Sequence, residues 1–115
     1  MILTDKAILA EIEKKNIVIE PYDRKYLGTN SYDVHLSKYL ATYTQPVLDA
    51  KLHNTIHHFE IPEEGFVLEP GVLYLGSTLE YTETHAHVPF LDGKSSMGRL
   101  GIDIHATAGI ADAGF

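Results

Sequence analysis

The chain of 115 residues is long enough for one domain, and its 44% hydrophobic content allows a single modest core. It contains no cysteine, which excludes a disulfide scaffold and any thiolate metal site. With a formal net charge of −7, no apolar run of membrane-spanning length and no signal-peptide pattern, the chain is expected to be cytoplasmic, with neither a nucleic acid polymer nor a membrane as partner.

The N-terminal residues predict one short helix followed by a strand. Thr4 can cap a helix whose apolar face holds Ile8, Leu9 and Ile12 and whose last turn carries Lys14 and Lys15. The β-branched run over residues 17–20 predicts a strand that Pro21 stops, and residues 22–29 indicate a loop.

The rest of the chain favours short strands. Residues 32–36 alternate in polarity, and residues 66–69 and 72–82 flank a Pro70-Gly71 turn, which predicts a hairpin. Residues 102–108 alternate again, and the Tyr and Leu side chains of residues 72–81 are expected in the core. The fold class predicted is mainly β, as a compact barrel or sandwich with a short N-terminal helix.

The segment Gly93-Lys94-Ser95-Ser96-Met97-Gly98-Arg99-Leu100-Gly101 carries the clearest chemistry. Ser96 can cap a single helical turn, and helix spacing places Ser95 and Arg99 on one side of it. Free amides, two hydroxyls and two cations would then converge on an anion such as a phosphate chain. The alternative is a serine-capped turn whose Lys94 and Arg99 only pair with surface acids.

This segment resembles the Gly-Arg-Ser-Ser-x-x-Arg-Leu-Gly motif of the dCTP deaminase family, within the dCTP deaminase / dUTPase superfamily. Residues 105–115, His-Ala-Thr-Ala-Gly-Ile-Ala-Asp-Ala-Gly-Phe, resemble the segment that follows it in the family. The N-terminal helix, the Ile19-Glu20-Pro21 exit and residues 31–34 also match the family's opening, so the resemblance spans the chain.

The resemblance implies a β-clip (dUTPase-like) barrel, a homotrimer, and hydrolysis of dCTP to dUTP with Mg²⁺ bound through the substrate triphosphate. Residues 94–99 would line the phosphates and the attacking water, with Ser95 orienting the water and Arg99 stabilising the developing charge. Ala108 would offer its backbone near the base, and Asp112 would meet the deoxyribose. The substrate-binding residues implied are Lys94, Ser95, Ser96, Met97, Gly98, Arg99, Ala108 and Asp112.

Two departures from the family pattern refine this expectation. Lys94 stands where the motif usually has Arg, which keeps the charge but loses bidentate geometry. Ala108-Gly109, followed by residues 112–115, is closer to the bifunctional branch, so the product can be dUMP.

In the family, the general-base Glu lies on the strand after the segment that ends at Phe115. We therefore expect residues 1–115 to be a single dCTP deaminase-like domain that lacks its C-terminal part and is nearly inactive alone. The alternatives are a truncated non-catalytic nucleotide-binding trimer module, and a dUTPase, whose phosphate motif is instead Arg-Ser-Gly. Zinc-dependent deamination requires cysteine ligands, so any deaminase here is zinc-independent.

Two histidine pairs offer a metal site as a further alternative. His85 and His87 would share one face of a strand, and His57 and His58 are expected in a polar loop. Neither pair has a third ligand nearby, so solvated surface histidines are the commoner explanation. Asp33 is expected to hold backbone in a turn or interface. Asp103 is expected to face solvent or a neighbouring subunit.

Overall fold

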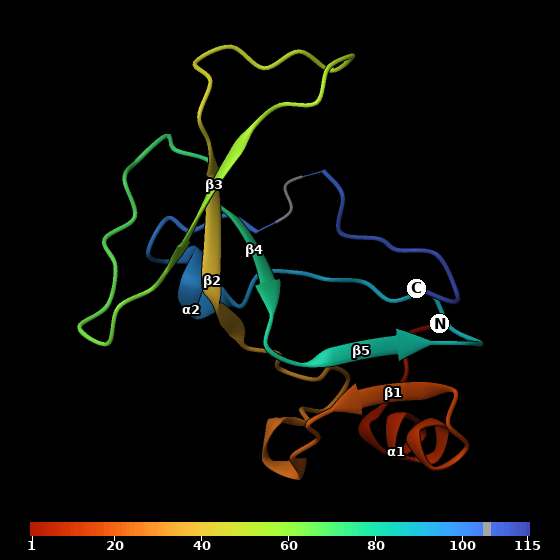
Figure 1. Cartoon of the computed structure of the whole chain (residues 1–115). Coiled ribbons are helices and arrows are strands. Elements are labelled where there is room, and N and C mark those ends of the chain that lie inside the picture. Colours follow the sequence, from red (N-terminus) through yellow and green to blue (C-terminus); the bar gives the residue numbers. More distant parts are fainter. Residues whose placement is uncertain (105–106) are drawn as a thin grey trace. The chain divides into compact units, whose positions relative to one another are not determined.

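The computed structural model describes residues 1–104 and 107–115, which form two compact units (Figure 1). The first unit comprises Met1–Asp33 and Glu80–Phe115, and the second comprises Val34–Leu79. Within the described residues, the first unit holds a two-stranded sheet and the second a three-stranded sheet. The predicted mainly β, dUTPase-like fold with a short N-terminal helix is confirmed.

Helix α1 (Asp5–Glu13) opens the first unit, and its boundaries follow from local chemistry. The hydroxyl of Thr4 accepts a hydrogen bond from the Ala7 N–H at 3.4 Å, so the predicted cap is confirmed. The helix ends at Glu13, two residues before the predicted Lys15, because Lys15 adopts a left-handed conformation with φ 61°.

Strand β1 (Ile17–Glu20) pairs antiparallel with β5 (Tyr81–Thr84), and α1 packs against β1 (Figure 1). The predicted strand over residues 17–20 is therefore confirmed. A short 3-10 helix, η1 (Arg24–Tyr26), interrupts the predicted loop that follows. It forms there because the Asp23 carboxylate accepts from the Lys25 N–H at 3.0 Å.

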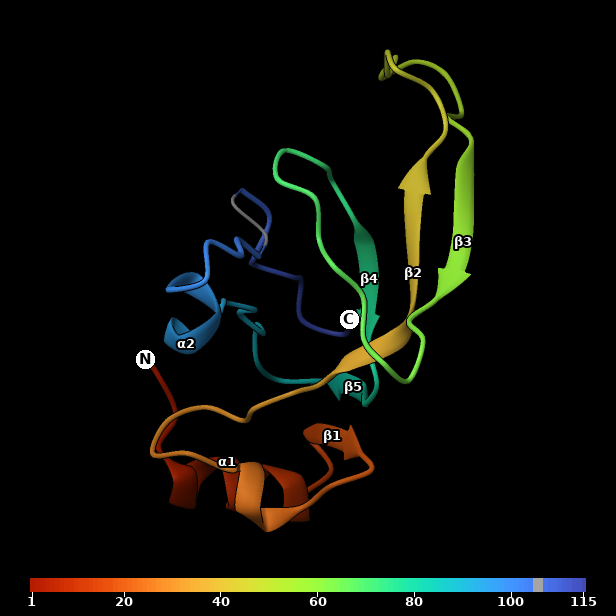
Figure 2. The same ribbon diagram turned by 90° about the vertical axis from the view of Figure 1, so that its left-hand side faces the viewer.

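The second unit is a sheet in the order β3-β2-β4, in which β2 (Leu36–Tyr43) pairs antiparallel with β3 (Ile56–Glu60) and β4 (Leu75–Thr78) (Figure 2). Leu40 and Ala41, on the central strand, are the buried apolar residues of this unit. Gly76 of β4 lies opposite Leu40 of β2, and a Cβ at Gly76 would lie 3.1 Å from the leucine side chain.

Three strand predictions were wrong in the described residues. The strand expected over residues 32–36 begins only at Leu36, because Tyr32 bridges to Leu27 and its hydroxyl accepts from the Asp23 N–H at 3.0 Å. Residues 66–69 form no strand, since β4 pairs with β2 instead. Residues 102–104 and 107–108 are not in a strand, and residues 105 and 106 of that prediction lie outside the described part.

The expected core over residues 72–81 was wrong for three of its Tyr and Leu side chains, whereas Tyr74 and Leu75 are half-buried. Leu73, Leu79 and Tyr81 are each about three-fifths exposed, at 60%, 62% and 59%. Leu73 and Leu79 lie outside β4 (Leu75–Thr78), in the segments that flank it, and Tyr81 is the first residue of the two-stranded sheet's β5, so none of the three side chains is enclosed; no described side chain is fully buried. Among the described residues, no helix is long and apolar enough to cross a membrane.

Candidate active site

The segment predicted to carry the chemistry lies in the first unit and contains the one-turn helix α2 (Ser95–Gly98). The carbonyl oxygen of Lys94 accepts from the N–H groups of Met97 and Gly98 at 2.8 and 3.1 Å. The N–H of Arg99 donates to the carbonyl oxygen of Ser95 at 3.1 Å. The predicted helical turn is confirmed, and Lys94, Ser95 and Arg99 are all exposed on it.

Ser96 does not cap this turn, contrary to the prediction. The cap position belongs to Lys94, which makes no side-chain cap bond, and Ser96 is the second residue inside the helix. The helix starts earlier than a serine cap requires because the Lys94 carbonyl oxygen already accepts the first helical hydrogen bonds. Both serine hydroxyls consequently remain exposed to solvent.

The two cations of the segment differ in their surroundings. The Lys94 ammonium donates to the Asp33 carboxylate, 61 positions away in the sequence. Both side chains are well exposed, at 62% and 45%, and such surface pairs contribute only about 0–1 kcal/mol, so an incoming polyanion can displace the carboxylate. Arg99 forms no ion pair within residues 1–104 and 107–115.

A second element of the site is the antiparallel pairing of residues 89–91 with residues 109–111. Phe90 bridges Ile110, and the Leu91 N–H donates to the Gly109 carbonyl oxygen at 2.7 Å. The two backbones approach so closely that a Cβ at Gly109 would lie 2.6 Å from the Leu91 carbonyl oxygen. Only glycine fits there without a shift of one backbone.

An open cavity of about 410 Å³ borders this pairing. Its lining residues include Asp92, Asp103 and Ala108. Gly93 joins the cavity to the helical segment, because its N–H donates to the Asp92 carboxylate at 2.8 Å and it directly precedes Lys94; a Cβ at this position would lie 3.8 Å from the Ile104 side chain. The sequence did not indicate Asp92 as a site residue, and Asp103 was expected to face solvent or a neighbouring subunit, since neither residue belongs to the motif.

Not all predicted site residues meet at this cavity. Ala108 lines it, whereas residues 94–99 and Asp112 are not among the described lining residues. Asp112 is exposed, and its carbonyl oxygen accepts from the Phe115 N–H at 3.2 Å. The arrangement therefore consists of a cationic, hydroxyl-bearing turn beside a polar cavity, within one unit.

The histidines have other partners in this structure. His85 pairs with Glu83 at 2.9 Å, and residues 57 and 58 lie within β3 rather than in the polar loop that was expected. They are in a strand because β3 pairs along its whole length with β2. In the described part of the chain, no group of three or more His, Asp or Glu residues could hold a metal ion.

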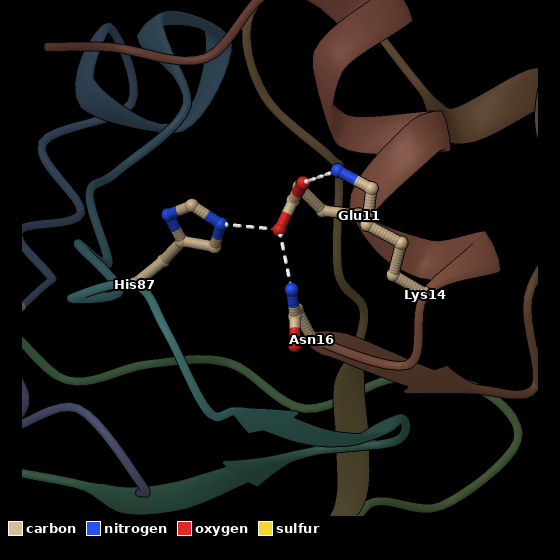
Figure 3. Close-up of polar contacts among 4 residues, drawn as sticks. All are labelled: Glu11, Lys14, Asn16 and His87. Carbon is tan, nitrogen blue, oxygen red and sulfur yellow. Dashed lines mark hydrogen bonds and ion pairs between the residues drawn. The ribbon is translucent and has the colours of Figure 1, made fainter.

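Glu11 is the centre of a polar cluster that the sequence did not indicate (Figure 3). Its carboxylate accepts from Lys14 Nζ, Asn16 Nδ2 and His87 Nε2, each at 2.8 Å. The hydrogen bond from Lys14, followed by those from His87 and Asn16, lowers the pKa of Glu11 from 4.5 to about 2. An ionised carboxylate only accepts, so the His87 ring donates from Nε2.

Comparison with known proteins places these features in a family. The family model described as dCTP deaminase-like matches residues 2–115. A protein of Leptospira biflexa serovar Patoc named "dCTP deaminase, dUMP-forming" is 53% identical over 115 residues, which is 100% of this chain and 66% of the relative. A protein of the same name from Clostridium acetobutylicum is 53% identical over 115 residues, and the match covers 100% of this chain and 66% of the relative. A third, from Cytophaga hutchinsonii, is 51% identical over 113 residues, and the match covers 94% of this chain and 65% of the relative.

Proposed function

Because the chain belongs to the dCTP deaminase-like family, we propose that it serves the hydrolytic deamination of dCTP, with dUMP as the final product. The observation that carries the proposal is the exposed turn Lys94–Arg99, with two cations and two hydroxyls, beside the cavity lined by Ala108. The chain spans 66% of the length of the Leptospira biflexa relative.

Lys94 and Arg99 are the proposed phosphate ligands. The Arg99 guanidinium is exposed and can form two parallel hydrogen bonds to phosphate oxygens. Lys94 exchanges the Asp33 carboxylate for a phosphate oxygen, which conserves its charge pairing. Met97 and Gly98, within the same turn, contribute backbone close to the phosphates.

Ser95 is the proposed residue that orients the attacking water, and Ser96 adds a second hydroxyl. A hydroxyl can donate to one group while it accepts from the water, which fixes the water's direction of attack. Arg99, at the other end of the same turn, offsets the negative charge that develops during attack. Water adds to the amino-bearing carbon of cytosine and ammonia leaves, which converts dCTP to dUTP.

The cavity beside the turn is the proposed place for the base and sugar. Backbone groups of Ala108 at its lining can hydrogen-bond the pyrimidine edge, and the exposed Asp112 carboxylate can accept from the sugar hydroxyl. A second hydrolysis then releases pyrophosphate and gives dUMP. The name of the relatives and the Ala108-Gly109 pair support this product over dUTP.

Mg²⁺ is the proposed cofactor and would be bound through the oxygens of the substrate triphosphate, whose negative charge it reduces. The exposed side chains of Lys94 and Arg99 can hold the triphosphate that would carry the ion. Water activation is proposed to be zinc-independent because the chain has no cysteine for the zinc site of other deaminases.

We also propose that the protein assembles as a homotrimer in the cytoplasm. The support is the exposure of large apolar side chains in both units, such as Val67 at 85% and Leu100 at 71%, which further chains can bury. Light scattering on the purified protein should give three times the chain mass. A well-folded monomer at high concentration would contradict the assembly.

The function is tested by product analysis with dCTP as substrate. The protein is the chain completed with the parts of the Leptospira biflexa relative that lie outside the match, and the products are separated by chromatography. Release of ammonia with dUMP and pyrophosphate supports the proposal, and accumulation of dUTP assigns deamination alone. Nucleotide binding without any turnover supports a non-catalytic module, and hydrolysis of added dUTP without attack on dCTP supports a dUTPase.

A further inference from the structure

The Glu11 cluster joins three segments of the first unit that are distant in sequence (Figure 3). Glu11 and Lys14 belong to α1 and its C-cap, Asn16 precedes β1, and His87 follows β5. The bond to His87 spans 76 positions, and the Glu11 side chain is only 15% exposed. A contact of this span differs from the Lys14–Glu11 pair, whose partners are only three positions apart and whose lysine side chain is 63% exposed.

Backbone bonds reinforce the same connection. The His85 N–H donates to the Asn16 carbonyl oxygen at 2.9 Å, so Asn16 binds His85 through its backbone and Glu11 through its side chain. Two polar contacts therefore fix the chain at residues 85 and 87, directly after β5 ends at Thr84. The direction in which the chain leaves β5 is thereby determined.

The fixed segment leads straight to the candidate site. Two residues beyond His87, the Pro89 carbonyl oxygen accepts from the Ala111 N–H at 3.1 Å, and the Leu91 N–H donates to Gly109 at 2.7 Å. Phe90, Leu91 and Asp92 then line the cavity, and Gly93 directly precedes Lys94, the N-cap of α2. Residues 87–93 thus connect the Glu11 cluster to both halves of the site.

We propose that Glu11 is a positioning residue that, through its hydrogen bond to His87, holds residues 87–93 so that the cavity and the Lys94–Arg99 turn keep their relative geometry. Its catalytic consequence rests on the function proposed above. Small displacements of a reacting group cost large factors in rate, so loss of this bond is expected to lower turnover even though Glu11 touches no substrate.

The first experiment measures amide hydrogen exchange in the full chain, which requires no activity. Glu11→Gln should accelerate exchange at the N–H groups of Leu91 and Ala111 by about tenfold or more. Glu13→Gln is the matched control, since it makes the same chemical change on an exposed position of the same helix. Amides of β2, in the other unit, should exchange equally in all variants, which distinguishes a local effect from global unfolding.

A second variant pair separates the His87 bond from general damage. His87→Gln keeps a side-chain N–H that can donate to Glu11, whereas His87→Ala does not. Exchange at Leu91 should stay near wild type in His87→Gln and rise in His87→Ala. Unchanged exchange in both Glu11→Gln and His87→Ala would overturn the proposal.

The kinetic consequence is measured in the completed protein described above. Glu11→Gln should lower kcat for dCTP by about tenfold with a smaller change in KM, and Glu13→Gln should leave both unchanged. Accelerated exchange with wild-type kcat would refute the positioning role. Absence of deaminase activity in the unsubstituted protein would refute the proposed function, while the exchange data would still decide whether Glu11 holds residues 87–93.

Discussion

Replacing Gly109 with alanine tests the close approach on which the cavity depends. The new Cβ would lie 2.6 Å from the Leu91 carbonyl oxygen, far inside the ordinary contact range, and neither atom can rotate away because the backbone fixes the position of both. The strands must separate, which weakens the 2.7 Å bond from Leu91 to Gly109. Overpacking costs about 1–3 kcal/mol and a lost hydrogen bond about 0.5–1.5 kcal/mol, against a gain of about 0.4–1 kcal/mol from the stiffer unfolded chain.

The net effect expected for Gly109→Ala is a loss of about 1–3 kcal/mol, or a Tm lower by about 4–12 °C in a domain of this size. Gly98→Ala is the control, because a Cβ there meets nothing within 4 Å and alanine favours a helical position by about 0.5–1 kcal/mol. Thermal unfolding followed by circular dichroism should therefore shift the two variants in opposite directions. A Gly109→Ala variant that melts with the wild type and keeps its Leu91 amide protected would refute the reasoning.

Further predictions concern the Lys94–Arg99 turn, the loss of stability at low pH and the residues needed for turnover. In the completed protein, Ser95→Ala should lower kcat more than it raises KM, and Lys94→Ala should mainly raise KM; steady-state kinetics check this, and equal effects on KM alone would mean that Ser95 has no role in water attack. Since the pKa of Glu11 is lowered from 4.5 to about 2, its stabilising contribution is complete above about pH 4.5 and is lost as the pH falls toward 2. Melting curves at pH 6, 4 and 3 should consequently show a larger fall in Tm with decreasing pH in the wild type than in Glu11→Gln. An equal fall in Tm in both proteins would contradict the assigned contacts. A polypeptide of residues 1–115 alone should deaminate dCTP about 10²–10⁴ times more slowly than the completed protein, because neither Ser95 nor Arg99 is a base near neutral pH. Ammonia release within about tenfold would instead indicate a base among the carboxylates Asp92, Asp103 and Asp112.

Local features were predictable because neighbouring residues cause them. Thr4 lies three positions before the amide that it caps, and the strand over residues 17–20 follows from its β-branched composition and from Pro21. The turn over residues 95–98 likewise forms from backbone bonds within a few positions. The motif in residues 93–101 also indicated the family, since its identity depends on residue order alone.

Strand pairing could not be read from the sequence in the same way. The Pro70-Gly71 turn forms, yet the expected hairpin does not, because β4 gains a better partner in β2 than in residues 66–69. For the same reason, residues 57 and 58 are in a strand that their polar composition did not suggest. Pairing partners are chosen by contacts between distant segments, which local propensity does not contain.

The sequence by itself determined the helix start, the first strand, the turn with its cations and hydroxyls, and the family to which they belong. Only the tertiary structure decided which distant groups those residues meet: Asp33 beside Lys94, 61 positions apart, and His87 beside Glu11, 76 positions apart. It also decided that Gly109 must lack a side chain, because the Leu91 carbonyl oxygen occupies the space. The physical reason is that short-range hydrogen bonds are fixed by spacing along the chain, whereas these contacts arise only when folding brings separate segments to one place.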